Sequence, residues 1–501
     1  MKVRHTGSSL TDVSADLLVV CVHGAPSRSE IVKELDAALE GRLLARVKAL
    51  GMEGKPGESA TVYSGDALSA EHLRIVGAGP EKDFRPAALK DMAADAVRAG
   101  GKLGAKTVVF ALPAGAAQDL ERATELAATG AQLGAYRFDK YRHQSKKPPL
   151  SVGDVQIATA AAAPSSKAPT ARALTGAVRR GEAISQAVAQ ARDFVNIPAG
   201  DMTPAKLATE ARAIARKHGL TAKVLGAAEC KRLGMGMFLD VAKGSAREPK
   251  FIHLVYKPKS KPKKRVALVG KGIMFDSGGY SLKPTSGMLE MKADMSGAAA
   301  VIAAMGAVAA LKVPYEVHAI AACCENMISG EAYKLGDVIK GMDGTTVEVT
   351  NTDAEGRLTL GDAITYARQK VKPDQIFDFA TLTGACMVAL GPYTAAVLSN
   401  DDDLAEKWLE ASRAAGEDMW QMPLNTKLGE QLKSPIADMK NAGDRFGGAI
   451  TAGLFLKNFV KDSPWVHVDI AGPATSSREQ GAWSQGGTGF SVATIAEYLR
   501  D

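Results

Sequence analysis

Short apolar segments typical of buried strands alternate with longer helical segments along most of the chain. In the first part, the strand-like runs are ADLLVVCV (15–22), HLRIVGAG (72–79) and TVVFALP (107–113), and the segments between them have the apolar spacing of helices. Such alternation is typical of strands that lie parallel in one sheet with helices packed on its faces. The sequence therefore predicts an α/β fold with a mostly parallel sheet.

A second α/β succession follows a helical pattern that starts near Thr175 and ends at the two prolines of NIPAGDMTP (196–204). Its main strand-like runs are KFIHLVY (250–256), RVALVG (265–270), YEVHAIAAC (315–323), TTVEVT (345–350), QIFDFA (375–380) and WVHVDIAG (465–472). A chain of 501 residues is too long for one ordinary core. We expect an N-terminal α/β domain over 1–170, a connecting helix over 171–196 and a larger α/β domain over 197–501. The larger domain should contain a mixed, mostly parallel sheet flanked by helices.

The segment 143–170 differs from both successions in composition. It contains HQSKKPPL and AAAAPSSKAPT, in which Pro, Ser, Lys and Ala dominate. Such a composition is typical of linkers. We interpret this segment as the last strand of the first domain followed by a flexible junction.

Cysteine content and hydropathy predict a cytoplasmic protein with no membrane segment. The five cysteines form no CxxC pair, which argues against a disulfide framework and for a reducing compartment. No apolar run approaches the roughly 20 residues that span a bilayer. The N-terminus also lacks the apolar core and small-residue cleavage site of a signal peptide.

The densest basic run is KPKSKPKKR (257–265), which lies between two strand-like runs. We interpret this run as a solvated hairpin turn. Contact with nucleic acid or another anion is the alternative.

Charged residues gather where strand-like runs end. The run VALVGKGIMFDSGGYSLKP (266–284) carries Lys271, Asp276 and Lys283, and a helical pattern starts near Asp294. The motif NTDAEGRL (351–358) follows TTVEVT and adds three more charged residues, which are Asp353, Glu355 and Arg357. In open α/β sheets, ligands bind at the carboxyl ends of strands. The sequence therefore predicts a site at this edge of the sheet.

Four acids at one site need compensating charge. Clustered carboxylates repel one another and raise one another's pKa. Two divalent cations, bridged by carboxylates, would balance the four charges of Asp276, Asp294, Asp353 and Glu355. The alternative is a set of separate surface acids at helix N-termini, where acids are favoured in any protein.

Lys271 follows a buried strand-like run and is flanked by glycines. Burial and nearby cations lower the pKa of an amine, so a neutral Lys271 could ligate a metal. A salt bridge to one of the acids is the alternative.

Other catalytic motifs do not fit. The chain contains neither HExxH nor GxSxG, which excludes a zincin helix and a nucleophile elbow. The run VGKG lacks the first glycine and the Ser or Thr of a Walker A loop.

These residues resemble a known family. NTDAEGRL closely resembles the signature of the leucyl aminopeptidases, also called cytosol aminopeptidases, which are two-metal exopeptidases. The runs VGKGIMFDSGGYSLKP and MKADMSGAAAV (291–301) resemble the family's two other metal loops. The resemblance is strong over roughly 180–501 and loose before that. It implies a macro-like N-terminal domain with an oligomeric or regulatory role, and a C-terminal catalytic metallopeptidase domain.

The resemblance also implies roles for individual residues. One metal would be bound by Lys271, Asp276, Asp294 and Glu355. The other would be bound by Asp276, Asp353 and Glu355, so that Asp276 and Glu355 bridge the two metals. Lys283 and Arg357 match the two residues that the family assigns to catalysis.

An activity follows from these roles. The implied enzyme carries two divalent ions per subunit, Mn²⁺ or Zn²⁺, and a metal-bridged hydroxide attacks the peptide carbonyl. Lys283 would stabilise the oxyanion, and a bicarbonate held by Arg357 would move the proton. A structural salt bridge is the alternative role for Arg357. The resemblance further implies peptide substrates with Leu or another hydrophobic first residue, and a homohexamer.

The substrate cleft is expected to involve TLTGA (381–385), which supplies Thr381, Leu382 and Gly384. Met291 is a candidate wall of the first-residue pocket, with a role as core filler as the alternative. Two other functions remain open at this point. One is a metal-dependent phosphohydrolase, and the other is an aminopeptidase with an additional DNA-binding or regulatory role.

Overall fold

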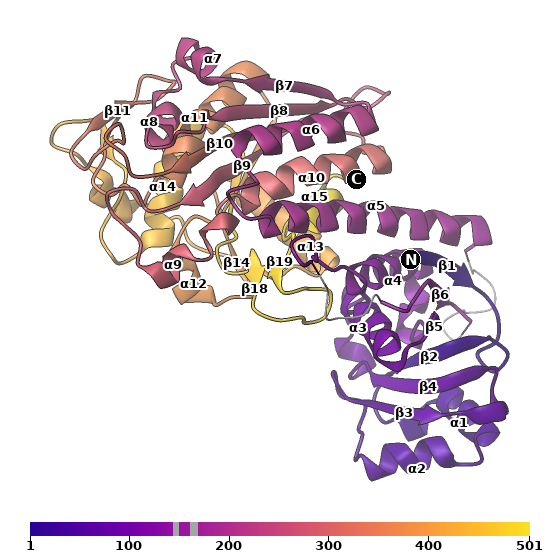
Figure 1. The fold of residues 1–501 in the computed structure, drawn as a ribbon. Helices are drawn as coiled ribbons and strands as arrows, with labels where there is room; N and C mark the ends of the chain where they lie inside the picture. The colour runs from indigo at the N-terminus through magenta and orange to yellow at the C-terminus, as the bar shows by residue number, and fades with distance from the viewer. Residues whose placement is uncertain (144–149, 161–168, 501) are drawn as a thin grey trace. The chain divides into compact units, whose positions relative to one another are not determined.

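The computed structural model describes residues 1–143, 150–160 and 169–500 (Figure 1). The chain divides into two compact units. Unit 1 contains residues 1–185 and 478–484, and unit 2 contains residues 186–477 and 485–501. The division falls within the long helix α5 (Ala171–Asn196).

Unit 1 is built on a six-stranded sheet. Its order is β1 (Lys2–Thr6), β6 (Asp154–Ala158), β5 (Thr107–Ala111), β2 (Ala15–Val22), β4 (Ala70–Gly77) and β3 (Ser59–Tyr63). Every neighbouring pair is parallel except β3 with β4. The α/β fold with a mostly parallel sheet predicted for the first part of the chain is confirmed.

Two cores lie on opposite faces of this sheet. Leu17 and Val19 of β2 pack with α3 (Ala88–Leu103) and α4 (Leu120–Gly134). The alternate residues Leu18 and Val20 instead pack with α1 (Glu30–Ala38) and α2 (Arg42–Ala49). Successive side chains of a strand point to opposite faces, so a continuous apolar run such as ADLLVVCV fits a strand that is covered on both sides.

Unit 2 is built on an eight-stranded sheet. Its order is β15 (Met419–Gln421), β14 (Ala395–Ser399), β17 (Trp465–Asp469), β13 (Gln375–Ala380), β9 (Arg265–Asp276), β10 (Glu316–Asn326), β8 (Lys250–Tyr256) and β7 (Thr221–Leu225). The central strands β17, β13, β9 and β10 run parallel, and antiparallel pairs flank them. This confirms a mixed sheet with a parallel centre.

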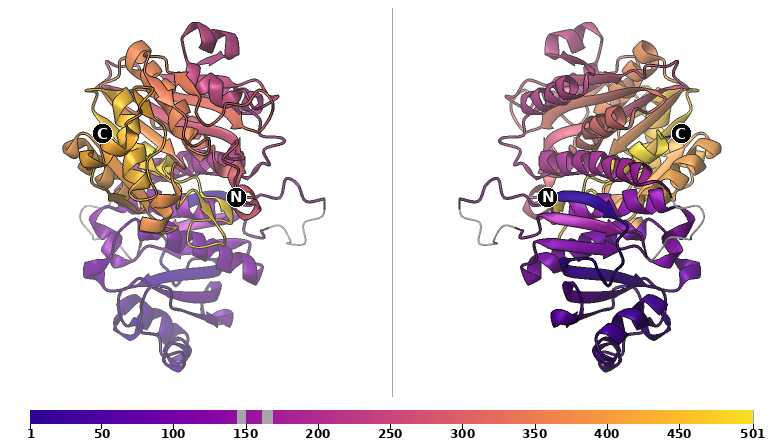
Figure 2. Two further views of the ribbon diagram at one scale, coloured as in Figure 1. Left: turned by 90° about the vertical axis from the view of Figure 1, so that its left-hand side faces the viewer. Right: turned by 90° about the vertical axis from the view of Figure 1, so that its right-hand side faces the viewer.

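Helices cover the eight-stranded sheet (Figure 2). The helices of unit 2 that follow α5 are α6 (Pro204–His218), α7 (Ala227–Arg232), α8 (Gly236–Ala242), α9 (Thr285–Met288), α10 (Ser296–Leu311), α11 (Gly356–Tyr366), α12 (Gly384–Leu390), α13 (Asp402–Ala415), α14 (Gly448–Val460) and α15 (Val492–Tyr498). Among them, α10 packs against β9, β10 and β13.

Small residues allow α10 to approach the sheet closely. A Cβ on Gly297 would lie 2.0 Å from the carbonyl oxygen of Phe379 and 2.9 Å from the backbone nitrogen of Lys271. The expectation that no apolar run approaches bilayer length is wrong for Thr285–Leu311, which is long and apolar enough to cross a membrane. However, 78% of its most apolar window is buried inside the protein. The apolar helix α10 at the end of this stretch is therefore a core helix of unit 2.

The expectations for the basic run and for the strand TTVEVT are wrong. The basic run over 257–264 does not form a hairpin turn, because β10 lies between β8 and β9 in the sheet. Its lysines are nevertheless exposed. TTVEVT contributes β12 (Thr346–Glu348) to a separate three-stranded sheet with β11 (Val338–Lys340) and β16 (Met439–Lys440), and does not extend the main sheet. The order of strands in a sheet depends on distant pairing, which local patterns do not reveal.

The segment 143–170 is described only in part. Its strand is present as β6, the last strand of unit 1 along the chain. The flexible junction expected after it falls largely on residues 161–168, which lie outside the described residues, as do residues 144–149.

Asp362 of α11 contacts the first turn of α8 and the loop that contains Met342. Its fully buried carboxylate accepts hydrogen bonds from the backbone N–H of Phe238 at 2.9 Å and of Met342 at 2.7 Å. Burial raises the pKa of this carboxyl to about 7, against the lowering effect of both hydrogen bonds. An acid buried in this way favours its neutral form in the folded protein.

We expect the stability of the protein to fall between about pH 4 and pH 7 because of Asp362. The unfolded chain releases this proton near pH 4, whereas the folded chain holds it until about pH 7. The unfolded state therefore binds fewer protons in this window, and stability declines as pH rises, by at most about 4 kcal/mol. The free energy of unfolding in urea, measured from pH 4 to pH 8, checks this expectation.

Asp362→Asn is the matched variant. Its amide has nearly the same shape but does not titrate, and it can accept only one of the two hydrogen bonds. We expect a lower stability at acid pH and a weaker decline towards neutral pH than in the parent chain. An unchanged decline would assign the pH dependence to other groups.

Candidate metal centre and active site

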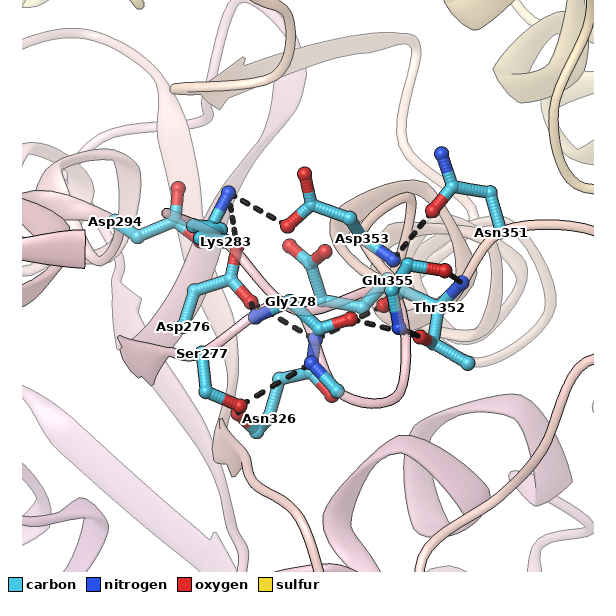
Figure 3. A network of polar contacts seen from close by, with 12 residues as sticks. Asp276, Ser277, Gly278, Lys283, Asp294, Asn326, Asn351, Thr352, Asp353 and Glu355 are labelled. Atoms are coloured by element: carbon cyan, nitrogen blue, oxygen red, sulfur yellow. Dashed lines mark hydrogen bonds and ion pairs between the residues drawn. The ribbon is translucent and has the colours of Figure 1, made fainter. Parts of the chain in front are cut away.

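Four segments of unit 2 bring charged residues together. The strand β9 ends at Asp276 and leads into the loop 277–284, and β10 ends at Asn326. The loop 351–355 leads into α11. The short 3-10 helix η5 (Met291–Ala293) leads through Asp294 into α10. Figure 3 shows Asp276, Asp353 and Glu355 turned toward one another beside Lys283.

The carboxylates form a tight cluster. Oxygens of Asp276, Asp353 and Glu355 all lie within 4.8 Å of one another. Asp276 and Glu355 are each only 1% exposed, and Asp294 is 5% exposed. Asp353 is partly exposed, with 32% of its side-chain surface accessible. The alternative of separate surface acids is therefore wrong, because Asp353 lies within the same cluster as the buried acids.

Two lysines pair with the cluster. The amine of Lys271 lies 2.8 Å from Asp294 and 2.8 Å from Glu355, and it donates to the carbonyl oxygen of Thr381 at 3.1 Å. The amine of Lys283 lies 2.9 Å from Asp276 and 2.6 Å from Asp353. The structure thus brings together six of the seven residues expected to bind metal or act in catalysis.

The pKa values of the acids reflect burial first. Burial raises the pKa of Asp294 well above its usual range, although Lys271 opposes this effect. Burial also raises the pKa of Glu355 and of Asp353, and the charge of Asp276 adds to both. Such acids favour a bound proton or a nearby positive charge.

Burial lowers the pKa of the Lys271 amine, but the charges of Asp294 and Glu355 outweigh burial and raise the pKa above its usual range. The same balance, with Asp276 and Asp353 as partners, raises the pKa of Lys283. Without bound ions Lys271 is therefore an ammonium group in a salt bridge. Its role as a neutral ligand stays a prediction for the metal-bound enzyme.

The donor set fits divalent cations. Among the described residues, the buried oxygens Asp294 Oδ2 and Glu355 Oε2 have no hydrogen-bond partner. Buried acceptors are rarely left in this way. Carboxylate oxygens with one amine nitrogen are ligands that Zn²⁺ and Mn²⁺ both accept.

Two glycines allow the loops to come this close. Gly278 and Gly279 have φ angles of +83° and +61°, which L side chains rarely adopt. A Cβ on Gly278 would lie 2.9 Å from Asp353 Oδ1, and one on Gly279 would lie 3.0 Å from Thr352 Oγ1. The loop 277–284 therefore needs glycine at both positions.

Arg357 lies in the first turn of α11 and is 7% exposed. Its Nη1 donates to the carbonyl oxygen of Asn441 at 2.9 Å, and its Nε has no partner in the part of the chain that the structure describes. Burial lowers the pKa of the guanidinium to about 10, so Arg357 remains charged at neutral pH. Within the described residues no carboxylate forms an ion pair with it, which argues against the structural salt bridge.

Of the four residues expected to bind substrate, Thr381 contacts an acid of the cluster directly, and the other three have different contacts. Thr381 follows β13, and its hydroxyl donates to Asp294 Oδ1 at 2.8 Å. The backbone N–H of Leu382 donates to Asp469 Oδ1 at 3.1 Å, and Gly384 begins α12. Met291 opens η5, where its carbonyl oxygen accepts from the N–H of Asp294 at 3.3 Å and its side chain is partly exposed.

Sequence reasoning missed several supporting residues. Asn326 donates to Asp276, and Thr352 accepts from the N–H of Ser281 at 2.7 Å. Buried Asp469 holds the loop after β13 through Leu382 and through the hydroxyl of Thr383 at 2.7 Å. A polar residue at the end of an apolar strand was the available signal for both Asn326 and Asp469.

Comparisons with known proteins agree with this geometry. The model of the cytosol aminopeptidase family, catalytic domain, matches residues 189–496, and that of the family's N-terminal domain matches residues 19–145. A probable cytosol aminopeptidase of Picosynechococcus sp. is 42% identical over 479 residues, which cover 94% of this chain and 93% of the relative. One from Alkaliphilus oremlandii is 40% identical and covers 100% of this chain and 99% of the relative.

Solved structures lead to the same family. A mutant of tomato leucine aminopeptidase superposes with a TM-score of 0.89 at 34% identity, over 100% of this chain and 96% of that one. The bottromycin maturation enzyme BotP in complex with Mn superposes with a TM-score of 0.83 at 36% identity, over 97% and 99%. These matches confirm the resemblance of the motifs and the fold class. The chain belongs to the cytosol aminopeptidase family and is an aminopeptidase hydrolase.

Proposed function

We propose that the enzyme uses two divalent ions, Mn²⁺ or Zn²⁺, to remove N-terminal Leu or another hydrophobic residue from peptides. The observation that carries this proposal is the cluster in which oxygens of the buried Asp276 and Glu355 and of the partly exposed Asp353 lie within 4.8 Å of one another. Membership of an aminopeptidase family favours this function over a phosphohydrolase.

Lys271, Asp276, Asp294 and Glu355 would hold one ion, and Asp276, Asp353 and Glu355 the other. The contacts of Lys271 with Asp294 and Glu355 support the first set, and the close approach of the three carboxylates supports the second. When bound, the ions would polarise the peptide carbonyl and lower the pKa of water. The structure of BotP, which contains Mn, supports manganese as one choice.

Lys283 would stabilise negative charge on the reacting carbonyl oxygen. Its amine lies between Asp276 and Asp353 and has a raised pKa, so it remains protonated. A positive charge held in place before the reaction needs no rearrangement as charge develops, which makes this kind of stabilisation effective.

Arg357 would hold a bicarbonate ion that accepts and returns a proton. Its guanidinium is buried and charged, and it has a free Nε among the described contacts. The planar fork of arginine fits a carbonate-type anion. The described residues offer no salt bridge that would use this charge otherwise.

The cluster also explains why an enzyme of this kind would act at an N-terminus. In its unprotonated form the free α-amine of a peptide would be a ligand for one of the two ions, and only the N-terminal residue carries such an amine. Met291 would form a wall of the first-residue pocket, and Thr381, Leu382 and Gly384 would line the cleft. Contact of Thr381 with Asp294 supports this position for the loop.

For the whole chain we propose a cytoplasmic homohexamer without membrane attachment. Residues 1–170 would form a domain with an oligomeric or regulatory role, 171–196 the connecting helix and 197–501 the catalytic domain. The relatives, named cytosol aminopeptidases, support this location.

Metal removal tests the central proposal. We expect dialysis against a chelator to reduce turnover of Leu-p-nitroanilide at least about 100-fold, because the cations supply the electrophile and the activated water. Refilling with Mn²⁺ or Zn²⁺ should restore activity, with about two ions per chain by mass spectrometry. Glu-p-nitroanilide tests the first-residue preference, and p-nitrophenyl phosphate tests the phosphohydrolase. Full activity in the stripped enzyme would exclude the proposal.

Gly356→Ala tests the position of the Lys271 amine. A Cβ on Gly356 would lie 2.4 Å from Lys271 Cε and 2.6 Å from its Nζ, and the three nearest atoms all belong to Lys271. The backbone of Gly356 does not have a positive φ, so alanine fits the helix and the amine must move. We expect kcat to fall about 10- to 100-fold, the range for disturbed metal ligation.

Gly429→Ala is the matched control. Gly429 lies in the 3-10 helix η7 (Thr426–Leu432), and a Cβ there would meet no atom within 4 Å. We expect this variant to keep the parent kcat. Equal activity of both variants would mean that the position of Lys271 does not matter for the reaction.

Arg357→Ala tests the proton carrier. We expect kcat to fall by about 10²- to 10⁴-fold, the usual contribution of proton transfer by a positioned group. Added bicarbonate should stimulate the parent enzyme but not the variant. A variant with unchanged kcat, or one that responds to bicarbonate like the parent, would remove this role from Arg357.

A further inference from the structure

Asn326 connects the two loops that carry the central acids. This residue ends β10 and is completely buried. Its side-chain Nδ2 donates to Asp276 Oδ1 at 2.8 Å and to the carbonyl oxygen of Thr352 at 2.9 Å. Asp276 is the last residue of β9 and immediately precedes the loop 277–284, and Thr352 immediately precedes Asp353. Figure 3 shows the amide between these two loops.

The orientation of the amide follows from its neighbours. Both partners of Nδ2 are oxygen atoms that can only accept, so a flipped amide would place its own oxygen against two acceptors. In the observed orientation Oδ1 has no hydrogen-bond partner among the described residues. The site therefore leaves a buried acceptor unpaired in order to keep both donors in use, which is uncommon for a residue that only fills space.

The main chain of Asn326 reinforces the connection. Its carbonyl oxygen accepts from the N–H of Ser277 at 3.0 Å and from the Ser277 hydroxyl at 2.8 Å. A Cβ on Gly279 would lie 3.1 Å from Asn326 Oδ1. The loop 277–284 is therefore packed directly on Asn326.

These contacts distinguish the two oxygens of Asp276. Oδ1 accepts from Asn326 Nδ2 and also from the N–H of Gly278 at 2.9 Å. Oδ2 lies 2.9 Å from the amine of Lys283. One oxygen is thus held by the protein framework, and the other faces the charged cluster.

We propose that Asn326 is a positioning residue of the metal centre. Its amide determines which oxygen of Asp276 is presented to the cations, and it fixes the loop 351–355 at the same point. This inference rests on the proposed two-metal function. Asn326 itself contacts neither substrate nor metal in this scheme, and acts through Asp276, as residues that orient metal ligands commonly do.

Asn326→Leu tests this role, because leucine has a similar size but no donor. We expect the Kd for Mn²⁺, measured by calorimetric titration of the metal-free enzyme, to rise about 10- to 100-fold. At saturating Mn²⁺ we expect kcat for Leu-p-nitroanilide to fall at least about tenfold while KM stays within about twofold. A residue that serves only to hold loops would lower the melting temperature without changing the Kd.

Asn196→Leu is the matched control. Asn196 is another buried asparagine of unit 2, at 5% exposure, and its Oδ1 accepts from the N–H of Gly487 at 2.8 Å. We expect this variant to bind Mn²⁺ like the parent even if its melting temperature falls. If Asn326→Leu does not fold, Asn326→Ser replaces it, because a hydroxyl is too short and has too few donors to reach both oxygens.

The outcomes separate the inference from the function on which it rests. Parent enzyme that binds neither Mn²⁺ nor Zn²⁺ would overturn the two-metal function and this inference together. Parent enzyme that binds two ions, with an Asn326 variant of equal Kd and kcat, would overturn the inference alone. An equal loss of Mn²⁺ affinity in the Asn326 and Asn196 variants would also overturn it, because the loss would then be general.

Discussion

Burial of like charges is the constraint on which the active site depends. Four carboxylates lie at the centre, and two lysines compensate them only in part, which leaves a formal charge of −2. Removing an ion from water costs several kcal/mol unless it is paired, and burial raises the pKa of Asp294, Glu355 and Asp353. The fold must therefore hold these groups firmly and accept further positive charge. The divalent cations proposed above would meet both needs.

The framework that holds the acids is made of contacts between loops. Glycines at 278 and 279 allow the loop after β9 to approach Thr352, and the amide of Asn326 connects this loop to the segment before Asp353. Behind them lies the rigid parallel centre of the sheet, in which β9 is paired on both sides by β10 and β13. Loops anchored on such strands can keep charged groups close together, whereas free loops would separate them.

The sequence allowed prediction of what local patterns determine. Apolar alternation identified the α/β layers, and charged residues after strand-like runs identified the acids of the centre. The pairing of strands was less accessible, because β12 belongs to a separate small sheet and β10 separates β8 from β9. Asn326 was missed for a related reason. Its role depends on two acceptors, on Asp276 and Thr352, that are 50 and 26 residues away along the chain. A local sequence pattern does not predict contacts between residues that are so far apart.

Helix N-termini add to the charge balance but do not replace cations. Three helices begin beside the centre: α10 two residues after Asp294, α11 directly after Glu355, and α12 at Gly384 after the loop that contacts Lys271. Each N-terminus favours a nearby anion by about 0.3–1 kcal/mol, and by up to about 2 kcal/mol when partly buried. The cost of burying one unpaired carboxylate is larger than this. Helix dipoles can therefore favour ionised acids at this edge of the sheet, while the remaining negative charge favours the cations that we propose to bind there.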